Sequence, residues 1–126
     1  MQNYLLVFLG AGAGGALRHA FNLGFARLFP STVGASTLVV NVLGSFLMGM
    51  LIEWLSTKTG VTQGTRLFLA TGVLGGFTTF SAFSLDTVLL YERGQIGWAA
   101  LYACASVLMS VGALVAGLVL TRHFAH

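Results

Sequence analysis

Polar side chains recur every four residues in two stretches of the chain that are otherwise apolar. The members of each set are neutral and can form hydrogen bonds: Thr37, Asn41 and Ser45 in the first stretch, and Tyr102, Ser106 and Ser110 in the second. Residues four apart lie on one face of an α-helix, so each set predicts a polar stripe along an apolar helix. Such stripes serve either hydrogen bonding between helices or donation of hydrogen bonds to an ion that passes along them.

A third polar set lies in residues 72–84, which read GVLGGFTTFSAFS. Gly75 and Gly76 each weaken an α-helix by about 1 kcal/mol relative to alanine, so we expect the helix to break there. Carbonyls freed by such a break can bind a cation. If helix resumes afterwards, a spacing of three predicts a row of rings and a row of hydroxyls: Phe77, Phe80 and Phe83, and Thr78, Ser81 and Ser84. Ring faces attract cations and ring edges can favour anions, so the rings alone do not choose the sign of the ion.

The composition places these stripes in a membrane. The chain has 126 residues, of which 56% are hydrophobic and only 7% are charged, whereas soluble domains carry roughly 25% charged residues. The six Lys and Arg residues are scattered singly, which argues against a nucleic-acid-binding patch. No nucleophile, general base or cluster of metal ligands stands out within the apolar stretches, so we do not expect an enzyme.

Four apolar tracts are long enough to cross a bilayer, since one spanning helix takes about 20 residues. They fill the chain as a single transmembrane domain (1–126), with spans at approximately 4–28, 36–55, 67–91 and 97–120. The sequence therefore predicts an all-α membrane protein with four transmembrane helices, the third of them broken near mid-membrane.

Small residues spaced by four predict close packing between these helices, because lipid offers no hydrophobic drive for helix association. The pairs are Gly10 with Gly14, Ser45 with Gly49, and Gly72 with Gly76. The chain has 17 glycines, so some such pairs arise by chance and the pattern alone is a weak signal.

The positive charges balance on the two sides of the membrane. Four spans put both termini on one side, and the cations divide into two equal sets: Lys58, Arg66 and Arg122 on that side, and Arg18, Arg27 and Arg93 on the other. Orientation follows an excess of Lys and Arg on the cytoplasmic side, and three against three gives no such instruction. We therefore predict dual topology, with an antiparallel homodimer as its natural product, because a two-fold axis in the membrane plane closes such a dimer.

Four spans, balanced charges and many aromatic residues are also typical of a proton-coupled cation exporter of the small multidrug type. Such exporters need an ionisable group inside the membrane to exchange substrate for protons. The carboxylates here lie elsewhere: Glu53 is close to the end of the second span, Asp86 lies past the predicted break and Glu92 is in a turn. The exporter hypothesis therefore lacks the residue that its mechanism requires. A non-transporting membrane subunit is a third alternative.

Three features together resemble the Fluc family of fluoride channels: GGFTTFSAFS at residues 75–84, Asn41 after Thr37-Leu38-Val39-Val40, and Arg18 after a glycine-rich first span. The resemblance covers essentially the whole chain. It implies an antiparallel, dual-topology homodimer with two pathways, through which toxic fluoride leaves the cytoplasm passively across the cell membrane, in bacteria the inner membrane. Hydrogen fluoride enters as a neutral weak acid and dissociates inside, so a leak for the anion relieves its accumulation.

The same resemblance implies roles for individual residues. A structural sodium ion (Na+) at the dimer centre would be held by the backbone carbonyls of Gly75 and Thr78. The fluoride pathway would draw on all four spans, through Phe80, Phe83, Asn41, Ser81, Thr79, Thr37, Tyr102, Ser106, Ser110 and Arg18. This chain departs from the family pattern at Ala82, where a hydroxyl donor is missing, and at Ser36, where glycine is common.

Overall fold

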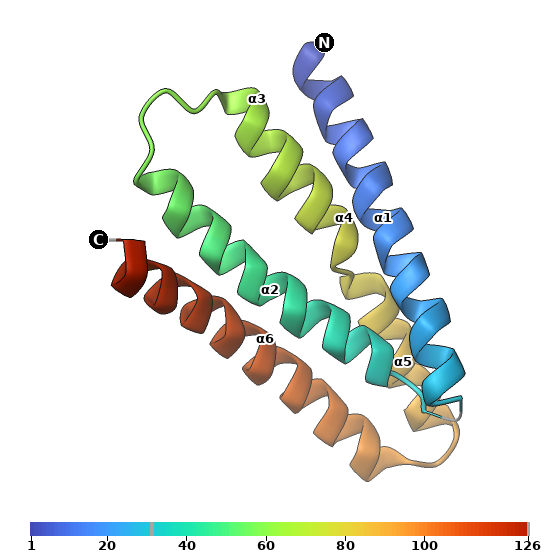
Figure 1. Ribbon diagram of the computed structural model, residues 1–126. Coiled ribbons are helices and arrows are strands. Elements are labelled where there is room, and N and C mark those ends of the chain that lie inside the picture. The colour runs from blue at the N-terminus through green and yellow to red at the C-terminus, as the bar shows by residue number, and fades with distance from the viewer. Residues whose placement is uncertain (31, 126) are drawn as a thin grey trace.

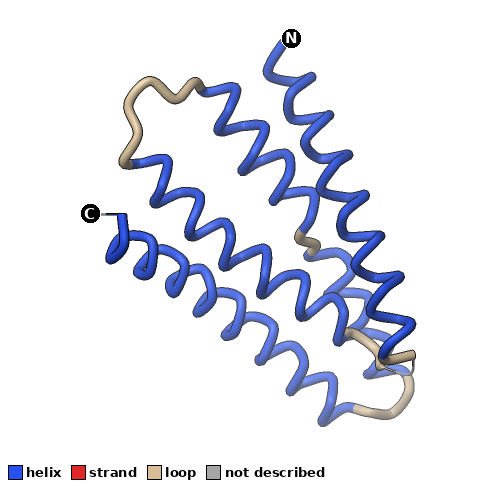
Figure 2. The backbone as a smooth tube through the Cα atoms, in the orientation of Figure 1, coloured by secondary structure: helices blue, strands red, loops and turns tan. Residues whose placement is uncertain are grey.

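A computed structural model of the chain describes residues 1–30 and 32–125, and the regular structure in those ranges is entirely helical. The helices follow one another along the chain as α1 (Gln2–Leu28), α2 (Ala35–Ser56), α3 (Gln63–Arg66), the π-helical segment η1 (Leu67–Leu74), α4 (Gly75–Phe77), α5 (Phe80–Glu92) and α6 (Ile96–Ala125). Figures 1 and 2 show them as a bundle of long antiparallel rods, one of which is interrupted partway.

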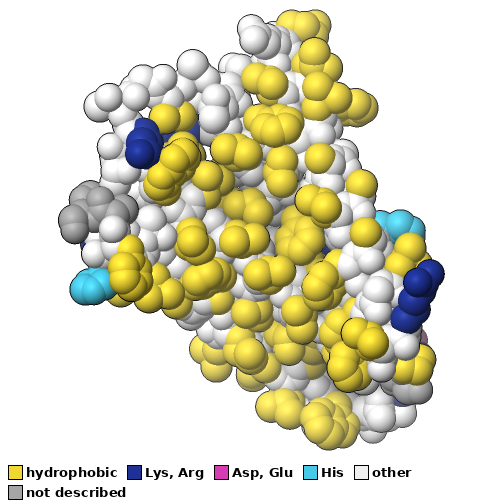
Figure 3. Space-filling model, viewed as in Figure 1, with side chains coloured by type: hydrophobic (Ala, Val, Ile, Leu, Met, Phe, Trp, Pro, Cys, Tyr) yellow, Lys and Arg dark blue, Asp and Glu magenta, His cyan; other side chains and the backbone are white. Residues whose placement is uncertain are grey.

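Four helical stretches are long and apolar enough to cross a membrane: Gln2–Leu28, Ala35–Ser56, Gln63–Glu92 and Ile96–Phe124. The predicted all-α fold with four spans is therefore confirmed, and so is a break within the third span, between α4 and α5. The fourth span extends past the predicted end at residue 120. Figure 3 shows the outer surface that this arrangement requires, with hydrophobic side chains over the visible face and charged ones near its ends.

The ends of the helices follow from local backbone chemistry. Pro30 disfavours helical geometry at the residue before it, and Phe29 accordingly leaves the helix with φ −135° and ψ 72°. Gly34, just before α2, has φ 83°, and Gly94, between α5 and α6, has φ 78°. Few residues other than glycine adopt such angles without strain, so these positions allow the tight turns that bring neighbouring spans together.

Glycines bring α1 into backbone contact with the first half of the third span. A Cβ atom on Gly10 would lie 2.9 Å from Gly72 Cα, and one on Gly76 would lie 2.9 Å from Ala11 Cα. A Cβ atom on Gly14 would overlap the carbonyl oxygen of Val73. The predicted small-residue faces at Gly10 with Gly14 and at Gly72 with Gly76 therefore meet each other, and no larger side chain fits between the two backbones.

Helices α2 and α6 form a second close pair. A Cβ atom on Gly49 would overlap the carbonyl oxygen of Leu114, and one on Gly117 would overlap that of Phe46. Near the ends of the same helices Arg122 donates two hydrogen bonds to Glu53, at 3.2 Å to Oε1 and 3.1 Å to Oε2. The pair thus has a fixed separation, and it carries both of the predicted polar stripes.

Candidate functional site

The third span breaks at Thr78 and Thr79, which have extended backbones with ψ 157° and ψ 119°. The prediction that the break falls at Gly75 and Gly76 is wrong by about one helical turn, since Gly75 itself is helical with φ −64° and ψ −36°. The physical reason is packing. Gly76 lacks a side chain because its backbone lies against Ala11. The helix ends only at Thr78 and Thr79, where side chains replace the backbone hydrogen bonds that are lost.

Asn41 supplies the main replacement. Its Nδ2 donates to the Thr79 carbonyl oxygen at 3.0 Å, and the Thr79 backbone N–H donates to its Oδ1 at 2.8 Å. The amide therefore satisfies both polar groups of one extended residue from a neighbouring helix. Thr79 then caps α5, because its Oγ1 accepts a hydrogen bond from the backbone N–H of Ala82 at 3.1 Å.

Two of these hydrogen bonds, those donated by the backbone N–H groups of Thr79 and Ala82, leave two carbonyl oxygens without their helical donors. In an uninterrupted α-helix the carbonyl of Gly75 would accept from the N–H of Thr79, and the carbonyl of Thr78 from the N–H of Ala82. Here Thr79 donates to Asn41, and Ala82 donates to the Thr79 side chain. Gly75 and Thr78, whose carbonyls the resemblance to Fluc channels implies as sodium ligands, are therefore among the residues whose carbonyls lose their helical partners. Hard cations are bound by oxygen ligands of this kind.

Residues Leu67–Leu74, directly before the break, form a π-helix, which sequence reasoning missed. In such a helix the hydrogen bond spans five residues, as in the bond from the Gly75 N–H to the Ala70 carbonyl. Apolar periodicity carries no signal for it, and the segment lies against α1, where Gly10 meets Gly72. π-Helical turns are rare and frequently lie at functional sites.

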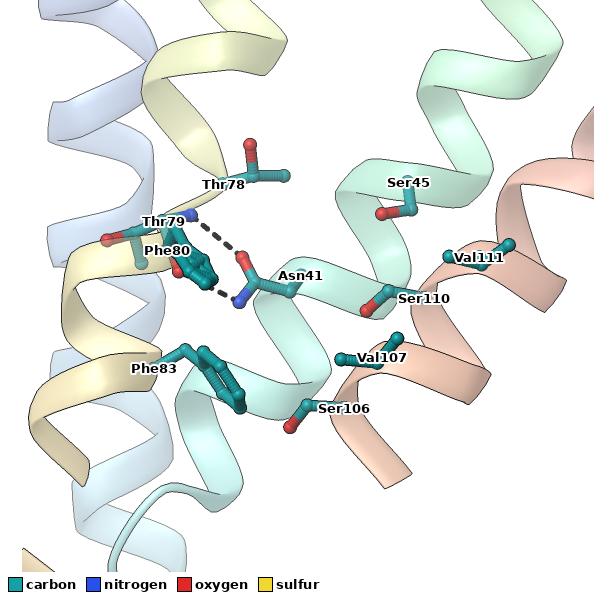
Figure 4. A pocket seen from close by; sticks show the side chains of 10 residues that line it. All are labelled: Asn41, Ser45, Thr78, Thr79, Phe80, Phe83, Ser106, Val107, Ser110 and Val111. Carbon is teal, nitrogen blue, oxygen red and sulfur yellow. Dashed lines mark hydrogen bonds between the residues drawn. The ribbon is translucent and has the colours of Figure 1, made fainter. Parts of the chain in front are cut away.

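A cavity of about 280 Å³ lies beside the break. It is bounded by α2, the break, α5 and α6, through the side chains of Asn41, Ser45, Thr78, Thr79, Phe80, Phe83, Ser106, Val107, Ser110 and Val111. Figure 4 shows the aromatic rings on one side and the serines of α2 and α6 on the other, with Asn41 between them. Six of the predicted pathway residues are thus brought together: Asn41, Thr79, Phe80, Phe83, Ser106 and Ser110.

The aromatic rings form a short ladder beside this cavity. The ring centroids of Phe80 and Phe83 are 5.2 Å apart, and those of Phe83 and Tyr102 are 5.6 Å apart. Phe80 is 70% exposed, although it comes directly after the break. The expected row of three phenylalanines is wrong, because the extended residues separate Phe77 from the other two. Phe77 is buried and lies against Gly44.

The hydroxyl groups divide between structural and uncommitted positions. Of the expected row of three hydroxyls, only Ser81 and Ser84 share α5, since Thr78 lies in the break. Thr78 donates to the Leu74 carbonyl at 3.1 Å and Ser84 donates to the Phe80 carbonyl at 3.0 Å. Ser81 instead pairs with Thr79 at 3.2 Å. The Ser110 hydroxyl oxygen, by contrast, is buried and has no hydrogen-bond partner among the described residues.

A polar cluster follows at the end of the ladder. The Tyr102 hydroxyl donates to Asp86 Oδ2 at 3.3 Å, and the Thr37 side chain lies near the same hydroxyl. Asp86 was not among the predicted pathway residues. Its position three residues after Phe83, on the same face of α5, is the signal that could have identified it.

Several predicted residues lie outside the cavity wall. Thr37 and Tyr102 belong to the neighbouring polar cluster, while Gly75 and Ser81 lie on either side of the break. Arg18 is on α1, half-buried, and its Nε atom has no hydrogen-bond partner in the described part of the chain. The structure of this single chain therefore does not bring Arg18 into the cavity.

Comparison with known proteins shows a match over nearly the full chain. Residues 5–118 match the family described as CrcB-like protein, Camphor Resistance (CrcB). The chain belongs to the CrcB-like family. A relative from Nitrobacter hamburgensis, named fluoride-specific ion channel FluC 2, is 55% identical and aligns over 97% of this chain and 98% of its own length.

Further CrcB-like relatives have the same character. One from Granulibacter bethesdensis is 57% identical over 97% of this chain and 96% of its own, and one from Methylobacterium nodulans is 50% identical over 98% and 99%. Both carry the name fluoride-specific ion channel FluC. Together with the four spans, this family membership identifies the chain as a multi-pass bacterial membrane protein of a transporter family rather than an enzyme.

Proposed function

We propose that this CrcB-like chain is a passive fluoride-selective channel of the bacterial inner membrane that exports fluoride from the cytoplasm. The observation that carries the proposal is the cavity at the break, which is lined by aromatic rings and neutral hydrogen-bond donors. The relatives named as fluoride-specific channels support the choice of ion, because they align over nearly the whole chain.

The side chains of the cavity suit a small anion. Burying a bare ion costs tens of kcal/mol by idealised estimates, and a hydrogen bond to a charged group returns about 1.5–3 kcal/mol, so several donors must act in sequence. The serines Ser106 and Ser110 on α6 provide such donors, and the Asn41 amide has a second N–H besides the one given to Thr79. Phe80 and Phe83 can present ring edges, which carry partial positive charge.

A second copy of the chain completes this pathway in the proposal. Phe80 lines the cavity and is 70% exposed on the isolated chain, so one protomer does not enclose a route for an ion. An antiparallel dimer would enclose two such routes. The balanced positive charges support copies of opposite orientation.

A sodium ion at the dimer centre would be held by the carbonyl oxygens of Gly75 and Thr78 from both protomers. The donor set fits, because both carbonyls lose their helical partners through the hydrogen bonds of Asn41 and Thr79. The described residues hold no cluster of three or more His, Cys, Asp or Glu side chains that could bind a metal instead. The ion would fix the two breaks relative to each other.

Efflux from liposomes tests the proposal. The purified protein is reconstituted, and fluoride and chloride electrodes record ion release in parallel. We expect fluoride release without comparable chloride release. Fluoride release no faster than from protein-free vesicles would overturn the channel, and equal release of both anions would overturn its selectivity.

A further inference from the structure

An apolar groove runs between α2 and α6 and is separate from the cavity at the break, although the predicted pathway residue Tyr102 lines part of it. It consists of two adjoining cavities of about 500 and 480 Å³, which share Leu38 as a lining residue. The first lies between the start of α2 and the α5–α6 turn, and the second continues along the two helices. We call the two together the outer groove.

The outer groove and the fluoride cavity lie on adjacent faces of α6. Ala105, Met109 and Ala113 line the groove, whereas Ser106 and Ser110 line the cavity. Each helical residue is rotated by about 100° from the previous one, so the two sets are offset by about 80° on average around α6. Tyr102 lines the groove and lies on the same stripe as Ser106 and Ser110, so the groove and the cavity are neighbours with separate walls on either side of this stripe.

One end of the outer groove is polar and carries a positive charge. Arg93, Gln95 and Thr32 line it there, together with Trp98. Arg93 is exposed and forms no ion pair with any other described residue. Trp98 is 63% exposed, and tryptophan is enriched at the level of lipid headgroups. The first turn of α6, which begins here, has no acidic side chain, and the neighbouring Glu92 does not line the groove.

The rest of the outer groove is mainly apolar and is longer than one bilayer leaflet. From Leu101 to Ala116 the wall of α6 rises by about 22 Å at 1.5 Å per residue, enough for an acyl chain of one leaflet. Half of the hydrocarbon core of a bilayer measures about 15 Å. Small side chains such as Ala113 and Ala116 leave space along this wall, while Leu38 and Phe46 form the opposite one.

We propose that the outer groove binds one membrane phospholipid with an anionic headgroup. The phosphate and headgroup lie against Arg93, Gln95 and Trp98, and one acyl chain lies between α2 and α6. The cation at one end and the apolar wall long enough for an acyl chain together select this occupant, because a neutral apolar partner would not use Arg93. The proposal does not depend on which ion the channel conducts.

The intrinsic fluorescence of Trp98 provides the test. The chain has two tryptophans, so a Trp54→Phe variant reports from Trp98 alone. It is reconstituted in phosphatidylcholine with increasing fractions of acyl-brominated phosphatidylglycerol or, separately, acyl-brominated phosphatidylcholine. We expect half-maximal quenching at an about fivefold lower fraction of phosphatidylglycerol, the ratio that corresponds to one cation near an anionic lipid.

Three further variants decide the interpretation. Arg93→Gln removes the preference for phosphatidylglycerol, whereas Arg27→Gln, which changes a cation elsewhere on the same side, preserves it. Ala113→Phe fills the groove and reduces quenching by both lipids. Equal quenching by both lipids in the parent protein, or loss of the preference in Arg27→Gln, overturns the proposal. If a second copy covers the groove, neither lipid quenches Trp98, and that result also overturns it.

Discussion

Asn41 illustrates how much a single amide can decide. It donates to the carbonyl and accepts from the N–H of Thr79, so it replaces both hydrogen bonds that this residue loses by leaving the helix. An aspartate could not donate, and a leucine could do neither. Inside a membrane, where water cannot satisfy these groups, the break depends on this residue.

Replacement of Asn41 by alanine tests that dependence. We expect Asn41→Ala to lose about 1–3 kcal/mol of stability for each of the two peptide groups left unpaired, and to reduce fluoride flux by about tenfold or more. Ser45→Ala is the matched control, since Ser45 lines the same cavity from the same helix without supporting the break. Thermal unfolding in detergent and liposome efflux measure the two effects. An unfolding temperature for Asn41→Ala equal to that of the control would contradict the structural role.

Phe80 is a position where the effect of a substitution on conduction can be told from its effect on packing, because the ring is 70% exposed. We expect Phe80→Ile to cut fluoride efflux by about tenfold or more while the protein stays folded and dimeric, since the substitution removes a ring edge from the pathway but little buried contact. Phe77→Ile, at a buried ring, should instead lower the unfolding temperature. Size-exclusion chromatography accompanies the efflux assay, and loss of the dimer in Phe80→Ile would assign the ring to packing.

At the level of helices, hydropathy predicts that the four spans exist, but it does not predict where the third span breaks or where a helix becomes π-helical. The four spans follow from runs of apolar residues, and Pro30 and Gly94 mark where helices end. The position of the break does not follow from the glycines next to it. It depends on Asn41, which is distant in sequence, and on the packing of Gly76 against Ala11. The π-helical turns of η1 are also missed, since apolar periodicity carries no signal for them.

The glycine faces of α1 allow a matched comparison within one helix. A Cβ atom on Gly14 would overlap the backbone of Val73, whereas one on Gly12 would have nothing within 4 Å. We expect Gly14→Ala to destabilise the protein by about 1–3 kcal/mol or more, because two backbones must separate. Gly12→Ala should be neutral or stabilising by up to about 1 kcal/mol through helix propensity. Thermal unfolding in detergent measures both, and equal effects would contradict the close contact of α1 with the third span.

For the whole molecule, the sequence predicted the types of residue that line the candidate site, but it did not predict the full set of residues. One cavity does bring together two residues of each stripe, Asn41 with Ser45 and Ser106 with Ser110, and part of the motif at residues 77–83, because α2 and α6 pack closely beside the break. Asp86 is connected to the site by its hydrogen bond with Tyr102, and the spacing of polar residues on α6 does not predict this contact. Arg18 stays outside the cavity of the single chain. Sequence periodicity predicts which residues share one face of a helix. It does not predict which other helix packs against that face, because this depends on the tertiary structure.

The balance of positive charges gives a prediction for the whole chain in the membrane. We expect C-terminal reporter fusions to give signal from both sides of the membrane. A fourth cation on the side of the membrane that holds both termini, introduced as Gln63→Lys, should shift the population so that the C-terminus is mainly cytoplasmic. Paired cytoplasmic and periplasmic reporters measure the shift. Signal from a single side in the unmodified protein would refute dual topology.

The carbonyl oxygens at the break belong to the main chain, which every amino acid carries. Those of Gly75 and Thr78 lose their helical partners because Asn41 and the hydroxyl of Thr79 accept from the N–H groups of Thr79 and Ala82 instead. Under the sodium proposal, selection on ion binding would act most strongly on a residue that need not touch the sodium ion. Comparative surveys that search for ligands by residue identity would overlook such a site, and attempts to transplant it would have to move the supporting amide as well as the loop.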